Sequence, residues 1–410
     1  MLKHSSLILL LALSACNVEF HDGDSSVNYG PVIQEKRDVT EFTEIDMTGP
    51  YDVVVTGEGG PSLEIVGNEK LVKEVETVVT GNTLHIRSKS KTIIHLSTNF
   101  NSRQLTVKVA ASKLNRINVN GSGDLELNKF KGDKLELSVN GSGDVHANGV
   151  SKELQTNVNG SGDMDLSQWQ TTKATVQING SGNLTLGIVS DSLDSDINGS
   201  GDLSVKELKS AQVKSTIRGS GNVKLVGEIK QLGAQLDGSG DMEARGLKAG
   251  STTVRMNGSG DLSLAGDTSE LDVQVNGSGD FDGKSLHAGK AQFKTHGTGG
   301  ISSNTIRDKL SIELHGSGDM QANDIQSPQI DVLITGTSNL DLSGKGQLLV
   351  AKLSGSGDLN ASGLLVERAK VNATGTGVAE VNVKQNPAAG SKTGDGGSRI
   401  VRVDRNGLVN

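Results

Sequence analysis

The chain has 410 residues, of which 54 are glycine and only 2% are aromatic, and its net charge is −8. So few aromatic side chains predict a thin core of Val, Ile and Leu, because aromatic residues usually supply much of the buried area. The Lys and Arg residues are spread singly, which argues against a nucleic-acid partner, since phosphate binding needs a basic stripe. A single cysteine excludes a disulfide framework.

Residues 1–16, "MLKHSSLILLLALSAC", are typical of a bacterial lipoprotein signal peptide. Lys3 precedes an apolar run from Leu7 to Leu13 that is too short to span a bilayer. The tetrad ending at Cys16 resembles a lipobox, which implies cleavage before Cys16 and a membrane anchor on its lipidated side chain. An ordinary signal peptide with an incidental cysteine is the alternative. Asn17 is not the Asp of an inner-membrane retention signal, which favours an outer-membrane lipoprotein, periplasm-facing or surface-exposed.

Two segments precede the regular part of the chain. Residues 17–41 are polar without a sustained period and predict a flexible tether. Residues 42–118 predict an entry or capping β region. Short β-type runs lie at 51–57, 62–67, 82–88 and 105–110, and an amphipathic stretch lies at 69–79.

A corner motif, mostly Gly-Ser-Gly-Asp, recurs with a strict period from residue 121 onward. A longer and a shorter step, which differ by one residue, alternate without exception along the whole series. Such a period predicts a solenoid, here over residues 119–383. The motif begins at Gly121, Gly141, Gly160, Gly180, Gly199, Gly219, Gly238, Gly258, Gly277, Gly297, Gly316, Gly336, Gly355 and Gly375.

Each repeat contains two stretches that alternate between apolar and polar residues. In repeat 160–179, Met164 and Leu166 form one stretch, and Ala174, Val176 and Ile178 form the other. This period of two predicts two short strands per repeat. The loop between them carries one apolar residue, such as Phe130, Val150 or Trp169, and also the one-residue difference between long and short repeats. We therefore expect an all-β, single-stranded parallel β-helix with about 19–20 residues per coil, right-handed by the crossover rule.

The corner residues have a structural explanation. Glycine suits a backbone with positive φ, and the Asn before it in seven repeats tolerates the left-handed region. Stacked Asn and Ser side chains would form hydrogen-bonded ladders along the rod. A ladder of ligand-binding groups is the functional alternative.

The Asp of the motif is fixed only in every second repeat, so the full unit is two repeats. With one repeat per coil, this fixed series is spaced by roughly 10 Å, which limits charge repulsion. A competing geometry, one coil of double length with two corners, would stack the series directly and favour a bound cation. The fixed series, a turn element and candidate ligand ladder, is Asp124, Asp163, Asp202, Asp241, Asp280, Asp319 and Asp358.

Other candidate sites are weak. His296 and His315 precede the corner in adjacent repeats and could share a metal, although two solvated imidazoles explain them equally simply. The sequence contains no nucleophile motif, phosphate loop or metal cluster. Trp169 takes a position that is apolar in other repeats, which favours a core role over sugar stacking. We therefore expect no cofactor, no catalytic residues and no enzymatic activity.

The entry "FTEIDMTGPYDVVVTG", followed by "SLEIVG", "NTLHIRS" and repeated "INGSGNL" and "INGSGDL", resembles the putative autotransporter adhesin head GIN domain family over about residues 42–380. This resemblance implies a bacterial, secreted or lipid-anchored β-helical protein and brings no catalytic residues. The chain is longer than the family pattern, as if two domains were fused near 230–250, yet the period has no break there.

These observations predict a cell-envelope lipoprotein with an adhesin-like binding rod, whose partner is a glycan or a protein. A periplasmic scaffold without external ligand is the alternative, and a polysaccharide-active enzyme is the third hypothesis. Residues 384–410 form a polar tail in which "IVRV", 400–403, is expected to add a last strand or cover the open end.

Overall fold

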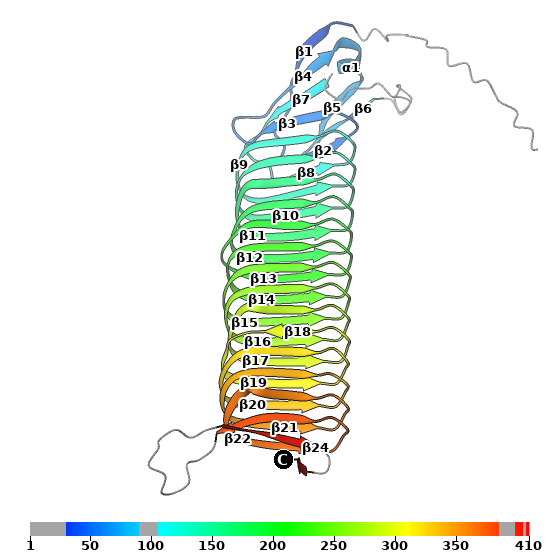
Figure 1. Ribbon diagram of the computed structural model, residues 1–410. Coiled ribbons are helices and arrows are strands. Elements are labelled where there is room, and N and C mark those ends of the chain that lie inside the picture. Colours follow the sequence, from blue (N-terminus) through cyan, green and yellow to red (C-terminus); the bar gives the residue numbers. More distant parts are fainter. Residues whose placement is uncertain (1–29, 90–104, 385–397, 405–406, 410) are drawn as a thin grey trace, which may run out of the picture.

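The computed structural model describes residues 30–89, 105–384, 398–404 and 407–409, and shows a parallel β-solenoid of about 13 turns. The coils stack into a straight rod, with the N-terminal elements at one end and β24 at the other (Figure 1). The predicted parallel β-helix with one repeat per coil is therefore confirmed. The predicted signal peptide, including Cys16, lies outside the described residues.

Most coils consist of one long strand followed by the Gly-Ser-Gly corner. The expected loop between two short strands is wrong, because that segment continues the ladder. In β11 (Met164–Ile178) the inward residues are 164, 166, 169, 171, 174, 176 and 178, so the alternation breaks twice and the strand bends at two places. The strands of this type are β9 (Leu125–Val139), β10 (Val145–Val158), β11, β12 (Leu184–Ile197), β13 (Leu203–Ile217), β14 (Val223–Leu236), β15 (Met242–Met256), β16 (Leu262–Val275), β17 (Phe281–Thr295), β20 (Met320–Ile334), β21 (Leu340–Leu353) and β22 (Leu359–Ala373).

The pairing register explains the alternating repeat length. Val145 of β10 pairs with Leu125 of β9 on one side and with Met164 of β11 on the other, so the first step is one residue longer than the second. The register shifts between Ala147 and Gly149, so the extra residue of a long coil is absorbed as a bulge near the first bend. Because each coil pairs with the repeat that follows it, the competing coil of double length is excluded. β14 and β15 pair in the same way, so the stack continues through residues 230–250.

The core is a set of aliphatic rows that run along the rod. Leu125, Val145 and Met164 begin one such row, and each is at most 1% exposed. Trp169 is also 1% exposed, and its ring stacks on Phe130 with centroids 5.2 Å apart. The expected core role of Trp169 is thus confirmed, whereas Val150 points to solvent and is 49% exposed.

The first coil is separated in sequence from the coil it packs on. β2 (Glu44–Thr48) and β3 (Asp52–Thr56) pair in parallel with β8 (Arg116–Val119) and β9. The corner between β2 and β3 begins at Gly49, which packs against Gly121. A long insertion between β3 and β8 therefore interrupts the first coil.

This insertion and the preceding residues form a cap on the N-terminal end. β1 (Val32–Arg37), β4 (Ser62–Asn68) and β7 (Leu105–Ala110) pair antiparallel, and β5 (Val75–Thr80) forms a hairpin with β6 (Thr83–Ser88). The amphipathic stretch forms a short helix, α1 (Glu69–Glu74), only in its first half. Because its backbone pairs with β4, β1 is ordered structure within the segment that the sequence predicts as a tether.

The other end is closed by strands of the opposite direction. β23 (Ala379–Lys384) continues the parallel stack, and β24 (Ser398–Asp404) pairs with it antiparallel. A short strand, β25 (Gly407–Val409), follows. The expectation that residues 400–403 add a last strand is confirmed.

Candidate functional site

The glycines of the corner are required by close backbone packing. A Cβ added at Gly180 would lie 1.9 Å from the carbonyl oxygen of Gly160 in the preceding coil. Both motif glycines of every described coil from Gly141 to Gly318 show the same approach, and none of them has positive φ. The predicted reason, a left-handed backbone, is therefore wrong. Positive φ occurs elsewhere, at the first bend, for example at Gly227 and Gly266.

The residues before the corner form a side-chain ladder. The Nδ2 of Asn140, Asn159 and Asn179 each donates to the Oδ1 of the Asn one coil earlier, over 2.8 Å. Further along, other polar residues replace Asn, including His296 and His315. Their rings stack with centroids 4.8 Å apart. The predicted Asn ladder is present.

The Asp of the motif forms a second ladder with a fixed direction. The Oδ1 of Asp163 accepts a hydrogen bond from the backbone N–H of Asn183 in the next coil, over 2.8 Å, and the Oδ1 of Asn183 accepts the N–H of Asp202 over 2.9 Å. All seven residues of the fixed Asp series act as acceptors in this way: Asp124, Asp163, Asp202, Asp241, Asp280, Asp319 and Asp358. Because Asn performs the same role, the bond itself does not require the negative charge.

The carboxylates are less separated than the fixed series alone predicts. Asp261 lies between Asp241 and Asp280, so three carboxylates follow one another at the rung spacing of about 4.8 Å. Asp124, Asp144 and Asp163 make a second run of this kind. The charge separation proposed from the two-repeat unit therefore holds for only part of the rod.

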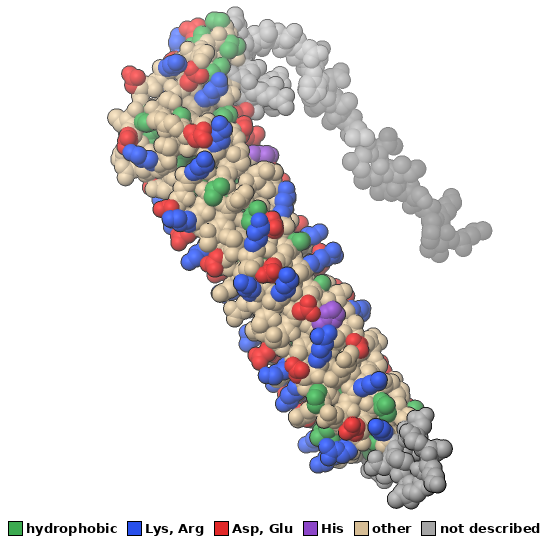
Figure 2. Space-filling view, turned by 90° about the vertical axis from the view of Figure 1, so that its left-hand side faces the viewer, with side chains coloured by type: hydrophobic (Ala, Val, Ile, Leu, Met, Phe, Trp, Pro, Cys, Tyr) green, Lys and Arg blue, Asp and Glu red, His purple; other side chains and the backbone are tan. Residues whose placement is uncertain are grey.

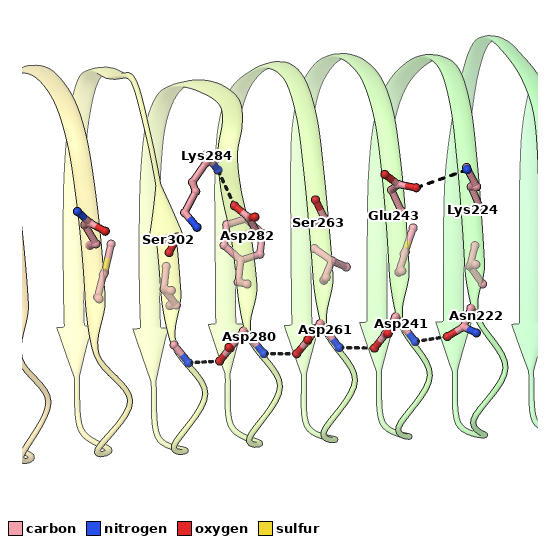
Figure 3. Close-up of a pocket in the computed structure, with 18 of the residues that line it drawn as sticks. Asn222, Lys224, Asp241, Glu243, Asp261, Ser263, Asp280, Asp282, Lys284 and Ser302 are labelled. Atoms are coloured by element: carbon pink, nitrogen blue, oxygen red, sulfur yellow. Dashed lines mark hydrogen bonds and ion pairs between the residues drawn. The ribbon is translucent and has the colours of Figure 1, made fainter.

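A long groove follows the Asp ladder along the first segment of eight successive coils. Its volume is about 930 Å³, and buried residues such as Met242 and Phe281 form its floor. The outer side chains of these strands border it, as do the ladder residues Asn222, Asp241, Asp261 and Asp280 (Figure 3). Its lining includes the carboxylates of Asp202, Asp241, Glu243, Asp261, Asp280, Asp282, Asp319 and Asp341.

Only two basic residues line this acidic groove. Lys224 lies 3.9 Å from Glu243, and Lys284 donates its backbone N–H to Asp282 over 3.0 Å. Eight carboxylates and two ammonium groups give the groove a formal charge of −6. By contrast, acidic and basic side chains are mixed over the face of the rod shown in Figure 2.

Smaller hollows lie elsewhere on the rod, and two of them are lined in part by β10 and β11. One, of about 510 Å³, is lined near the N-terminal end by Glu126, His146 and Asp165. Partial burial acts to raise the pKa of Asp165, but hydrogen bonds from Ser167 and the nearby His146 lower it overall. The other, of about 650 Å³, has a mixed lining that includes Lys173 and Lys214.

The histidine pair lies beside a threonine and a glutamate. The Nδ1 of His315 lies 2.7 Å from the hydroxyl of Thr335, and its Nε2 lies 3.8 Å from Glu313. Among the residues that the structure describes, no three His, Cys, Asp or Glu side chains are grouped to hold a metal ion. Within the same residues no helix is long and apolar enough to cross a membrane.

The sequence indicated the Asp and Asn rows but not the groove. The groove depends on which side chains of successive coils are short, such as Ser263 and Ser302, and which are acidic. These short and acidic residues occupy the position two residues after the Asp of the motif, where an alignment of the repeats would show them.

The chain is similar to solved structures of proteins from Bacteroides and Parabacteroides. They include a putative adhesin from Bacteroides fragilis (15% identity, 78% of this chain and 96% of that chain, TM-score 0.23). A putative lipid binding protein from Parabacteroides distasonis is 18% identical (85% and 96%, TM-score 0.27), and a putative adhesin from Parabacteroides merdae is 14% identical (85% and 95%, TM-score 0.24). No curated protein matches the chain.

A family model described as "putative auto-transporter adhesin, head GIN domain" matches four overlapping segments, residues 41–207, 187–265, 231–307 and 300–397. The family's description is that of an adhesin, a cell-envelope or surface protein, and not of an enzyme. These matches cover most of the chain and include both the entry segment and the corner repeats. The chain therefore belongs to the putative auto-transporter adhesin head GIN domain family.

Proposed function

We propose that this protein is a lipid-anchored, adhesin-like rod of the bacterial outer membrane that binds a partner along its acidic groove. The observation that carries the proposal is the groove itself, which extends over eight coils of a continuous solenoid. A rigid rod holds such a surface in a fixed geometry, so a long partner can contact many coils without ordering them first.

The position of the groove fits this proposal. β1 lies at one end of the rod, and the predicted anchor at Cys16 precedes it in the chain (Figure 1). The groove begins at Asp202 and reaches Asp341, toward the opposite end. A protein anchored through Cys16 would thus hold the groove away from the membrane.

An enzymatic role has less support from the described residues. Polysaccharide-active β-helices need exposed sugar platforms and grouped catalytic side chains. Trp169 is the only tryptophan of the chain, and it is packed in the core. The buried ring is unavailable for stacking on a sugar.

Three measurements test the proposal: one of surface display, one of membrane anchoring and one of partner binding. Protease treatment of intact cells should remove the protein if it is displayed at the surface. If the protein resists the protease until the outer membrane is opened, the periplasmic scaffold is indicated instead.

A Cys16→Ala variant should lose membrane association in detergent partitioning. Purified residues 17–410 should then bind components of a glycan array or host-surface proteins. If the purified protein binds neither the glycan array nor the host-surface proteins, that result would contradict an adhesive role.

A further inference from the structure

One rung of the Asp ladder lacks its side chain, and it lies inside the acidic groove. The position is Gly300, in the coil where the long strand is divided into β18 (Ile301–Ser303) and β19 (Ile306–Leu314). The Gly300 N–H donates to Asp280 over 2.7 Å, but glycine has no side-chain oxygen to offer the next coil. A Cβ at Gly300 would meet no atom closer than 3.4 Å, so a side chain fits there without a clash.

The missing side chain leaves a backbone donor open at the next rung. In the described coils from Asp144 to Val378, the N–H at the ladder position donates to an Asp or Asn side chain at every rung except Asp319. The notch at Gly300 thus combines the backbone N–H of Asp319 with the carboxylates of Asp280 and Asp319 on either side. It offers one hydrogen-bond donor and two negative charges.

We propose that the groove binds an extended, Lys- or Arg-rich polypeptide segment, with one cationic residue seated at the Gly300 notch. The inference rests on the proposed function, because it names the partner of the same groove. The formal charge of −6 selects a cationic partner by electrostatic complementarity. Eight coils at about 4.8 Å per rung give a length of roughly 34 Å, which suits a chain rather than a compact ligand.

The open donor at the notch distinguishes a polypeptide from a simple polycation. A peptide carries a carbonyl oxygen beside each cationic side chain, so it can satisfy the Asp319 N–H and pair with the carboxylates together. A polyamine carries the charges but no acceptor. We therefore expect the peptide to bind more tightly than a polyamine of the same charge.

The structure offers charge variants that keep the ladder intact. Asn183, Asn222 and Asn339 already make the ladder bond, so Asp241→Asn, Asp261→Asn and Asp280→Asn together should remove three charges from the groove without breaking it. The matched control is the triple change Asp124→Asn, Asp144→Asn and Asp163→Asn. It alters the net charge equally in the other carboxylate run, outside this groove.

The experiment measures fluorescence anisotropy of a labelled oligolysine peptide with purified residues 17–410. We expect binding at low ionic strength that weakens as salt is added, because the groove charges are exposed. The groove triple variant should bind at least about tenfold more weakly, and the control triple less than about twofold more weakly. Absence of binding at low salt, or equal weakening by both triples, would overturn the proposal.

Gly300→Asn tests the notch separately. The added side chain should complete the ladder, accept the Asp319 N–H and weaken peptide binding about fivefold, while spermine binding changes little. If Gly300→Asn leaves the peptide affinity unchanged, the peptide does not bind at the Gly300 notch. Spermine binding as tight as that of a peptide of equal charge would show that the groove recognises charge alone and would overturn the assignment to a polypeptide. Either failure leaves surface display, tested by protease treatment, as a separate result.

Discussion

Ser338 departs from the corner pattern, because it replaces the second glycine of its motif. It is fully buried, and its hydroxyl has no hydrogen-bond partner among the described residues. The equivalent Cβ at Gly318 would lie 2.0 Å from the Gly299 carbonyl oxygen, so the coil must shift to accept serine here. A buried, unsatisfied hydroxyl costs about 1–3 kcal/mol.

We predict that Ser338→Gly stabilises the protein. The gain from removing the hydroxyl should exceed the entropic cost of a new glycine, about 0.5–1 kcal/mol, and leave about 1 kcal/mol of net stabilisation. Urea unfolding and hydrogen exchange in residues 336–354 would measure it. Ser239→Gly is the control, because Ser239 is an exposed corner serine and its removal brings no such gain. A lower midpoint for Ser338→Gly would contradict this account.

At the scale of the corner, backbone packing predicts that a side chain added at a motif glycine is costly. Gly180→Ala would place a Cβ 1.9 Å from the Gly160 carbonyl oxygen and 2.9 Å from the Gly160 C and N atoms, and these backbone atoms leave little room to relax. We expect a destabilisation of about 3 kcal/mol, at the upper end for overpacking. Gly233→Ala is the matched control, since its Cβ would meet only one atom, at 4.0 Å. Thermal unfolding followed by circular dichroism would compare them, and equal midpoints would disprove the packing argument.

The same packing explains how much of the fold could be predicted from the sequence. Because close packing favours glycine at the corner, nearly the same motif recurs once in every coil, and the spacing of the motifs gives the coil length. The first coil could not be recognised in the sequence, because Pro50 and Tyr51 replace the Ser-Gly of its corner. In addition, the Asp52 side chain accepts the Asp124 N–H although the two residues are 72 positions apart in the chain. The bends within each strand were also missed, since a bent strand and a short loop both interrupt the alternation of apolar residues.

The candidate site was predictable only in part, for a related reason. The Asp series is visible as letters, and so is its interruption at Gly300. The sequence does not show that each carboxylate accepts the N–H of the next coil, nor that Asn serves equally well. Without knowing that each side chain accepts the N–H of the following coil, the glycine at position 300 could not be connected to the open N–H of Asp319. The groove likewise required knowing which outward rows lie side by side.

At the scale of the whole rod, the ends decide whether a solenoid remains a monomer. A coil at an open end presents unpaired backbone groups that can pair with another chain. The N-terminal end is covered by the insertion between β3 and β8, and the C-terminal end by β24, which pairs with β23 through residues 398–403. Near the same end, β22 carries the charged residues Glu367, Arg368 and Lys370, which oppose edge pairing.

We predict that a chain ending at Lys384 associates through its exposed end. Removing β24 and β25 frees one edge of β23, whose inward residues Ala379 and Val381 keep it aligned for pairing. Light scattering after size-exclusion chromatography should show dimers or larger species whose fraction rises with concentration, while the full chain at the same concentration serves as the control. The coils themselves should stay folded, because a solenoid is stabilised mainly by contacts between neighbouring repeats. A truncated chain that stays monomeric with an unchanged circular dichroism spectrum would show that the charged residues of β22 protect this end without the antiparallel cap.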